Sequence, residues 1–563
     1  MKPIIYQLFP RTFTNYNETR KHNGTKEENG CGKFADITPT ALKAIQDLGA
    51  THVWFTGVIR HATAEFNTPE ITKGKAGSPY AITDYYDVDP DLASAPGKGM
   101  AEFEALIRRT HKQGLKVIMD FVPNHVAREY KSLRKPKGVK DLGEDDHPEW
   151  AFSPLNNFYY LPGEKFEPYF NIGNYNEFPA KVTGNDCFTA HPGQNDWYET
   201  IKLNYGVFYQ GGGEKQFDPI PSTWFKMMSI LSFWARKGVD AFRVDMAEMV
   251  PIEFWRWLIP NVHTEFPNVE FIGEVYNPYL YRDFIDAGFN YLYDKVGMYD
   301  YLRGVTSKSW SAEGISHYWQ AVDDIHDHML YFLENHDEQR IASGFFCGSG
   351  RCAEPAMTIA ALLGRNPVLI WAGQELGEKG MDAEGFSGVD GRTTIFDYWG
   401  VKTLQAWANH GKFDGQLLTD EQSKLRLFYQ RLLRLARDNK AVSEGLMYDL
   451  EFAQSEGFDK HKQFVFLRKK DEELLLVVVN FEDKQREIDI RIPENAFVYL
   501  KQEPYEKATA TELLTDTVLT SLNAQGRTQK SIAFTAQQPI RVTLPAWTGA
   551  VYRIVDASKT KKC

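Results

Sequence analysis

The chain lacks the features that mark several large classes of protein. Among its 563 residues there are only five cysteines, scattered and odd in number, so a disulfide framework is not expected. Cys347 and Cys352 are close enough in sequence to bridge locally, but we expect free thiols there. No two cysteines have the Cys-x-x-Cys spacing of a zinc site, and zinc is not predicted.

No apolar run is long enough for a membrane span. The longest, residues 474–479, suits one buried strand, whereas a spanning helix needs about 20 apolar residues. Met1, Lys2 and Pro3 lead directly into a strand-like stretch and not into a signal peptide. We therefore expect a cytoplasmic protein, or a periplasmic or secreted one if a signal peptide has been removed from its start.

The chain also lacks an excess of positive charge, since its formal net charge is −11 at pH 7. That balance argues against nucleic acid or an anionic membrane as a partner. Internal repeats and low-complexity segments are absent as well. A hydrophobic content of 43% is enough for large cores, so we expect an ordered protein, and nothing in the sequence specifies its oligomeric state.

Short strand-like runs alternate with longer helical patterns over most of the chain, which predicts parallel βαβ units. Eight such strands suggest an α/β fold with a closed (β/α)₈ TIM barrel, formed by residues 1–125 and 222–440. Helices are predicted at 37–48, 100–113 and 223–237. The expected strands are 4–9, 52–55, 116–120, 239–244, 269–274, 291–294, 329–333 and 368–371.

Two further regions interrupt or follow this pattern. Residues 126–221 are rich in Asn, Gly, Pro and Tyr and are too long for a structureless loop, so we expect an inserted subdomain over the mouth of the barrel. After a helix at 421–439 the pattern becomes one of alternating strands. Residues 441–563 are therefore predicted to form a C-terminal antiparallel β-sandwich domain, ending in a solvated tail at 559–563.

Three acidic residues come directly after strand-like segments. Asp245 ends FRVD, Glu274 lies in GEV and Asp337 ends NHD. Carboxylates at these positions converge if their strands belong to one barrel, because a parallel barrel builds its active site at that end. A pair of carboxylates is what the cleavage of a glycosidic bond requires. A fourth segment, DFVPNH, has the same strand-then-polar form and ends at His125.

These four segments, in this order, resemble the α-amylase superfamily, glycoside hydrolase family 13. Supporting stretches are SPYAITDYYDVDP at 78–90, WAGQELGE at 371–378 and DGRTTIFDYW at 390–399. The resemblance implies a TIM barrel with an insertion after the third strand and a C-terminal β-domain. It also implies a retaining glycoside hydrolase that cleaves α-1,4-glucosidic bonds in maltooligosaccharides or starch-derived α-glucans.

The resemblance assigns a role to each of the three acids. It implies that Asp245 is the nucleophile, Glu274 the general acid/base and Asp337 the carboxylate that stabilises the transition state. Arg243 lies two residues before Asp245 and therefore points to the same face of the strand. Its charge is expected to keep the pKa of Asp245 low. Glu274 must instead start protonated, because it gives a proton to the leaving oxygen.

Further residues match positions that bind the sugar in this family. The resemblance implies that His125 and His336 hydrogen-bond the sugar at the scissile bond, that Tyr80 stacks under it and that Asp120 supports Arg243. No cofactor is implied as a requirement. Calcium is possible, since Asn124 resembles a residue that binds it in many α-amylases. The first loop, residues 15–30, offers other oxygen atoms for a hard cation.

The segment after the nucleophile departs from the pattern of many α-amylases. Glu248 and Met249 stand where those enzymes carry Lys-His to hold the sugars on the reducing side. A glucanotransferase or an α-1,6-glucosidase on the same scaffold therefore remains an alternative. A non-catalytic carbohydrate-binding relative is less favoured, because all three acids are present.

Overall fold

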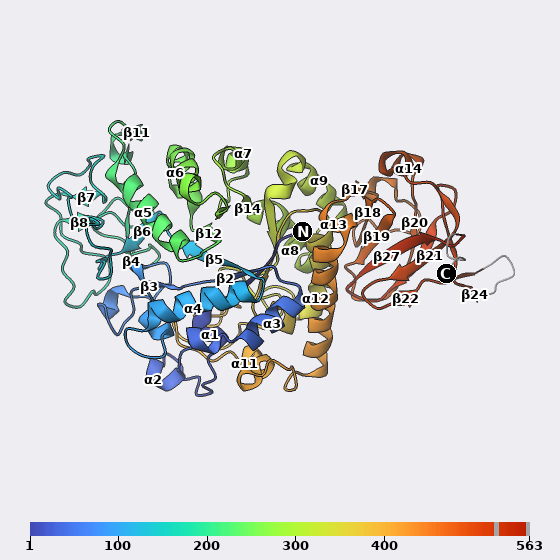
Figure 1. The fold of residues 1–563 in the computed structure, drawn as a ribbon, viewed down its shortest axis with the longest axis horizontal. Coiled ribbons are helices and arrows are strands. Elements are labelled where there is room, and N and C mark those ends of the chain that lie inside the picture. The colour runs from blue at the N-terminus through green and yellow to red at the C-terminus, as the bar shows by residue number, and fades with distance from the viewer. Residues whose placement is uncertain (523–527, 559–563) are drawn as a thin grey trace.

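The chain folds around a closed barrel of eight parallel strands (Figure 1). This computed structural model describes residues 1–522 and 528–558, so the tail expected at 559–563 lies outside the described residues. All eight predicted barrel strands are confirmed, with small differences at their ends. They are β1 (Ile4–Leu8), β2 (His52–Phe55), β5 (Lys116–Phe121), β12 (Ala241–Val244), β13 (Glu270–Gly273), β14 (Tyr291–Tyr293), β15 (Met329–Phe332) and β16 (Val368–Trp371).

Apolar side chains on both faces of these strands explain the barrel. Every residue of β2 and β16 is buried, as strands covered on both sides require. The predicted helices are confirmed as α3 (Pro39–Leu48), α4 (Gly99–Lys112) and α5 (Ser222–Arg236). The Thr38 side chain accepts a hydrogen bond from Ala41 N where α3 begins, and Gly49, with φ at 124°, ends that helix.

A hairpin that the sequence pattern did not predict follows β2. Its strands are β3 (Ile59–His61) and β4 (Ile82–Val88), which pair antiparallel with irregular register. The segment between them carries Lys73, Ser78 and Tyr80, which line the cavity described below. The hairpin therefore supplies one wall of the site.

The inserted region consists of short antiparallel ladders with a small core of its own. It follows β5, the third strand of the barrel, and lies at the end of the molecule opposite the C-terminal domain (Figure 1). The core contains Tyr159, Phe166 and Val182. The paired strands are β6 (His125–Ala127) with β9 (Thr200–Lys202), β7 (Tyr160–Leu161) with β8 (Ala180–Lys181), and β10 (Val207–Phe208) with β11 (Glu214–Lys215).

The long helix α12 (Asp420–Asp438) lies between the barrel and the C-terminal domain (Figure 1). One antiparallel sheet of that domain contains β17 (Leu446–Asp449), β18 (Gln463–Lys470), β19 (Glu473–Asn480), β27 (Thr548–Asp556) and β21 (Tyr505–Glu512). A second pairs β20 (Arg486–Ile490) with β26 (Ile540–Leu544). A separate apolar core is shared by both sheets, so the predicted β-sandwich is confirmed. Strand β21 and helix α14 (Glu494–Leu500) were not predicted.

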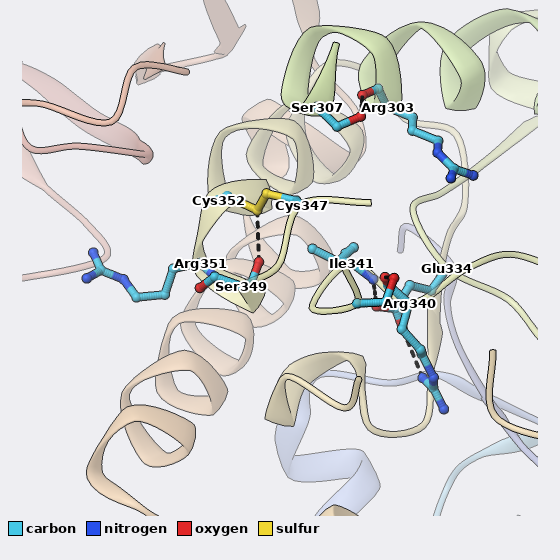
Figure 2. The surroundings of a disulfide bond; sticks show 10 residues. Arg303, Ser307, Glu334, Arg340, Ile341, Cys347, Ser349, Arg351 and Cys352 are labelled. Atoms are coloured by element: carbon cyan, nitrogen blue, oxygen red, sulfur yellow. Dashed lines mark hydrogen bonds and ion pairs between the residues drawn. A yellow bond between two sulfur atoms is a disulfide. The ribbon is translucent and has the colours of Figure 1, made fainter. Parts of the chain in front are cut away.

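The expectation of free thiols at Cys347 and Cys352 is wrong, because the structure joins these residues in a disulfide (Figure 2). The chain turns back through Gly350–Ala353 and brings the two Cα atoms to 6.5 Å, within the range a disulfide spans. Cys31 and Cys187 are free, as expected. Over the described ranges, no helix has the length and apolar character needed to cross a bilayer.

Candidate active site

The three predicted acids gather at the carboxyl-terminal end of the barrel. Asp245 directly follows β12, Glu274 directly follows β13, and Asp337 lies in the loop after β15. All three line one cavity of about 250 Å³. Gly273, directly before Glu274, is tightly packed, since a Cβ there would lie 2.8 Å from Leu292 Cδ2 and would require the neighbouring side chains to shift. The close packing of these strands thus places the acids around one space.

Arg243 holds the acids together from inside the barrel. It is fully buried and stands beside Asp120 in the register of β12 and β5. Its Nη1 donates to Asp245 Oδ1 at 2.7 Å and lies 3.5 Å from Asp120 Oδ1, while Nη2 lies 2.8 Å from Glu274 Oε2. Asp120 also accepts a hydrogen bond from Trp54 Nε1 at 3.1 Å. The predicted support of Arg243 by Asp120 therefore has a direct geometric basis.

The expectation that Arg243 keeps the pKa of Asp245 low is wrong. Burial raises the pKa of Asp245 well above its usual range; Arg243 lowers it, and the nearby carboxyl groups of Glu274, Asp337 and Asp120 raise it further. Burial likewise raises the pKa of Asp120 to about 6, against the lowering effect of Arg243. Three carboxyl groups, those of Asp120, Asp245 and Glu274, share the Arg243 guanidinium, so its charge is divided among them.

The two predicted histidines pack against aromatic rings close to these acids. The His336 ring stacks on Tyr80 with centroids 5.3 Å apart, and its Nε2 is 3.1 Å from Asp337 Oδ2. His125 packs against Trp197 at a centroid distance of 5.3 Å. Burial lowers the pKa of His125 to about 3 and that of His336 well below its usual range. Both rings are therefore neutral at ordinary pH. His125 lines the cavity, whereas His336 contacts Gln7 through Nδ1 and the Tyr80 hydroxyl through Nε2.

The loop that carries Asp337 is anchored by a buried ion pair (Figure 2). Arg340 Nη1 lies 2.8 Å from Glu334 Oε2, and both side chains are about 1% exposed. Ile341 N donates to the other Glu334 oxygen at 2.6 Å. Asn335 Oδ1 in turn accepts from Asp337 N at 2.9 Å. These contacts fix the backbone on both sides of Asp337, whose side chain stays 42% exposed to the cavity.

Asn124 does not offer a free ligand for calcium. Its Oδ1 accepts a hydrogen bond from Lys202 Nζ at 2.7 Å, and the same ammonium pairs with Asp186 at 2.5 Å. Lys202 is 2% exposed, so its charge lies inside the protein. A calcium ion on Asn124 Oδ1 would lie within a few ångströms of this ammonium, because calcium binds oxygen at about 2.3–2.6 Å. The residues present therefore fit an internal lysine cation and not calcium.

The oxygen atoms of the first loop are also engaged. Asn15 Oδ1 accepts from Asn17 N at 3.1 Å, and Asn29 Oδ1 accepts from Lys21 N at 2.7 Å. The first of these bonds forms an Asx turn, and the second links two parts of the loop that are eight residues apart. In the part of the chain that the structure describes, no group of three or more His, Cys, Asp or Glu side chains is arranged to hold a metal ion.

Several residues of the cavity were not predicted from the sequence. Ser78, Ile395 and Phe396 lie in the supporting stretches but were given no role, and the others come from loops without a motif. Glu199 is buried, and its Oε1 pairs with Lys73 at 3.0 Å. Its Oε2 has no hydrogen-bond partner among the described residues, which leaves an acceptor beside the cavity. The missed lining residues are Lys73, Ser78, Trp197, Glu199, Thr200, Met246, Tyr276, Ile395 and Phe396. Only the aromatic ones carried a signal, since sugar rings stack on aromatic faces.

Glu248, one of the two departures from the α-amylase pattern, turns toward the backbone of a neighbouring loop. Its Oε2 accepts hydrogen bonds from Tyr276 N at 3.1 Å and Asn277 N at 3.0 Å. Tyr276 follows Glu274 by two residues, so Glu248 fixes the segment that carries the acid. It thereby has a local function different from holding a sugar.

Comparison with known proteins agrees with this geometry. The chain is 26% identical to alpha-amylase 3 of Dictyoglomus thermophilum over 454 residues, which covers 74% of the chain and 79% of that protein. It is 21% identical to neopullulanase 2 of Thermoactinomyces vulgaris, covering 87% and 71%. A maltogenic alpha-amylase from Thermotoga neapolitana has the same fold, with a TM-score of 0.63, 17% identity and 98% coverage of both chains.

The family comparison extends over most of the molecule. The family model described as alpha amylase, catalytic domain, matches residues 7–460, a range that contains the insertion, every candidate site residue and all of the barrel except the first three residues of β1. Together with the closed barrel and its three acids, this match shows that the chain belongs to the α-amylase family of glycoside hydrolases, glycoside hydrolase family 13.

Proposed function

We propose that the protein hydrolyses α-1,4-glucosidic bonds in maltooligosaccharides or starch-derived α-glucans, with retention of the anomeric configuration. The observation that carries this proposal is the bridging of Asp245 and Glu274 by the Arg243 guanidinium at 2.7 and 2.8 Å. A shared guanidinium requires the two carboxyl groups to lie close together, as the spacing of about 5–5.5 Å in retaining glycosidases demands.

The first chemical step uses both carboxyl groups. Asp245 Oδ1 is held by Arg243, which leaves its Oδ2 to attack the anomeric carbon. Glu274 gives its proton to the glycosidic oxygen as the bond from that oxygen to the anomeric carbon breaks. The products of this step are a free sugar and a glycosyl group joined to Asp245.

The second step releases the glycosyl group. Glu274, now ionised, removes a proton from a water molecule as its oxygen attacks the anomeric carbon, and the bond to Asp245 breaks. Two inversions leave the product in the α configuration. Asp337, whose side chain lines the cavity, binds hydroxyl groups of the sugar ring during both steps, and His336, 3.1 Å away, helps to hold it in place.

Product analysis separates hydrolysis from the alternatives on the same scaffold. Maltoheptaose, pullulan, isomaltose, maltose and a cyclodextrin are each incubated alone with the protein and the products are chromatographed. We expect maltoheptaose to give only shorter sugars. Products longer than maltoheptaose would establish a glucanotransferase, and cleavage of isomaltose with no attack on maltoheptaose would establish an α-1,6-glucosidase.

We further propose that the enzyme works without calcium, because the Lys202 ammonium supplies the positive charge beside Asn124. Removal of metals with EDTA is expected to leave both the Tm and the rate of maltoheptaose hydrolysis unchanged. Replacement of Lys202 by Met is expected to lower the free energy of unfolding by about 1–3 kcal/mol, because a buried acceptor loses its donor. Differential scanning calorimetry measures the Tm, and urea titration measures the free energy of unfolding.

A lysine on the surface provides the control for this experiment. Lys215→Met removes the same charge from a side chain that is 52% exposed, and its effect on stability is expected to be within about 0.5 kcal/mol. Loss of activity in EDTA that added calcium restores would contradict the proposal.

A further inference from the structure

The two oxygen atoms of Glu274 have different surroundings. Oε2 accepts a hydrogen bond from Met246 N at 2.8 Å and lies 2.8 Å from Arg243 Nη2. Met246 has a positive φ of 45°, the left-handed conformation that aims its N–H at this carboxyl group. Because Oε2 accepts the Met246 hydrogen bond and is paired with the Arg243 guanidinium, we assign the exchange of a proton with the substrate to Oε1.

The hydroxyl group of Tyr276 lies on that second oxygen. Tyr276 OH donates to Glu274 Oε1 at 2.6 Å, a short hydrogen bond of the kind made to charged acceptors. Burial, with the nearby carboxylates of Glu274 and Asp337, raises the pKa of Tyr276 far above its usual range, so its hydroxyl stays protonated. No catalytic step described above uses this group.

Glu248 fixes the backbone of Tyr276. The Glu248 carboxylate accepts hydrogen bonds from the backbone of Tyr276 and Asn277, and the Tyr276 ring packs against the apolar residues that fill the barrel. Glu248 thus determines where the Tyr276 hydroxyl lies relative to Glu274. Glu248, which stands where many α-amylases carry a lysine, is thus connected through Tyr276 to the general acid Glu274.

The effect of the Tyr276 hydrogen bond on Glu274 depends on the other charged groups around that carboxyl group. The charged and titratable groups that face it are Arg243 and Asp245 from the end of β12, Tyr293 from β14, Asp337 from the loop after β15, and Tyr276 itself. Arg243 Nη2 lies 2.8 Å from Glu274 Oε2, whereas Asp245 and Asp337 place further carboxyl groups around it. A hydrogen bond donated to Oε1 favours the ionised form.

We propose that Tyr276, held in place by Glu248, is a positioning residue that orients the proton-carrying oxygen of Glu274 and stabilises its ionised state between the two chemical steps. The proposal rests on the function proposed above. Once the proton has left Oε1 for the glycosidic oxygen, the Tyr276 hydroxyl stabilises the carboxylate by donation. When water returns a proton to Oε1, the same hydroxyl oxygen accepts a hydrogen bond instead.

The test is the pH dependence of kcat/KM for maltoheptaose in Tyr276→Phe. The alkaline limb of this profile reports the loss of the proton that the general acid must give. Without the phenol hydroxyl the ionised form is less favoured, so we expect the limb to move to higher pH by about one to two units. The variant is therefore expected to keep a larger share of the wild-type rate on the alkaline side of the profile than on its acidic side.

A neighbouring tyrosine provides the matched control. Tyr279→Phe is the same change in the same loop, on a side chain that is 93% exposed and lines no part of the cavity, and its profile should overlay that of the wild type. Glu248→Ala, which frees the backbone of Tyr276, should move the alkaline limb in the same direction as Tyr276→Phe. Circular dichroism establishes that each variant is folded.

The possible results distinguish a failure of this proposal from a failure of the proposed hydrolase function on which it rests. If the wild type does not cleave maltoheptaose, the proposed function fails. If the wild type cleaves it and the folded Tyr276→Phe protein loses activity equally at every pH, the hydroxyl has a structural role only and the inference is overturned. An alkaline limb that stays in place in a fully active variant overturns it as well.

Discussion

Asp245→Asn is expected to lower kcat for maltoheptaose by about four orders of magnitude or more, because the variant has no nucleophile with which to form a glycosyl-enzyme. KM should change little, since His125, Tyr80 and Asp337, which line the cavity, remain. Steady-state assays of released reducing sugar at saturating substrate measure the loss. A rate within tenfold of the wild type would remove Asp245 from the mechanism.

The same substitution is expected to make the protein more stable at neutral pH. Burial raises the pKa of Asp245 in the folded protein above its value in the unfolded chain, so ionisation of this group disfavours folding. That cost is absent below the unfolded pKa of about 3.9 and grows as the pH rises above it. The difference in Tm between variant and wild type should therefore increase from pH 4 to pH 7.

An exposed aspartate gives the control for both measurements. Asp283→Asn changes a side chain that is 56% exposed, and it should alter neither kcat nor the pH dependence of the Tm. A fall in stability on replacing Asp245 would indicate that its pairing with Arg243 outweighs the cost of burial. Such a result would support the prediction from sequence that Arg243 keeps the pKa of Asp245 low.

Glu274→Gln is expected to lower kcat for maltoheptaose by about 10²- to 10⁴-fold, the usual contribution of a general acid. The loss should depend on the leaving group, because fluoride departs without a proton. With α-maltosyl fluoride, the variant is expected to release about one equivalent of fluoride per enzyme rapidly and then to turn over slowly, since Glu274 is also needed as the base that activates water. Stopped-flow detection of fluoride measures the burst.

Tyr279→Phe again serves as the comparison, because it changes an exposed side chain of the same loop. Equal losses on maltoheptaose and on the fluoride, with no burst, would show that Glu274 does not act through proton transfer. A burst in Glu274→Gln that is lacking in Asp245→Asn would separate the two roles.

Local sequence was sufficient to predict the barrel and the three acids. Parallel strands covered on both faces are continuous apolar runs, so segments such as HVWF of β2 and VLIW of β16 could be identified directly. Asp245 and Glu274 directly follow strands, and barrel closure alone then brings them together. In contrast, the β3–β4 hairpin has irregular pairing, and the alternation in β21 is carried by alanines, so neither gave a clear pattern.

The features that could not be predicted depend on contacts between distant parts of the chain. Lys202 reaches Asn124 across 78 residues, and nothing near either residue indicates that a lysine ammonium lies where calcium was considered. Glu248 reaches the backbone of Tyr276 across 28 residues. The pKa of Asp245 was misjudged because the Arg243 charge is shared with Asp120 and Glu274, and burial outweighs the remainder.

The configuration of the first product tests the central claim most directly. Proton NMR spectra recorded during the first minutes of maltoheptaose hydrolysis distinguish the two anomers before they interconvert. A double displacement through Asp245 predicts that the α anomer appears first and that the β anomer grows only by mutarotation. A product that forms first as the β anomer would contradict the retaining mechanism, and with it the role of Asp245 as nucleophile.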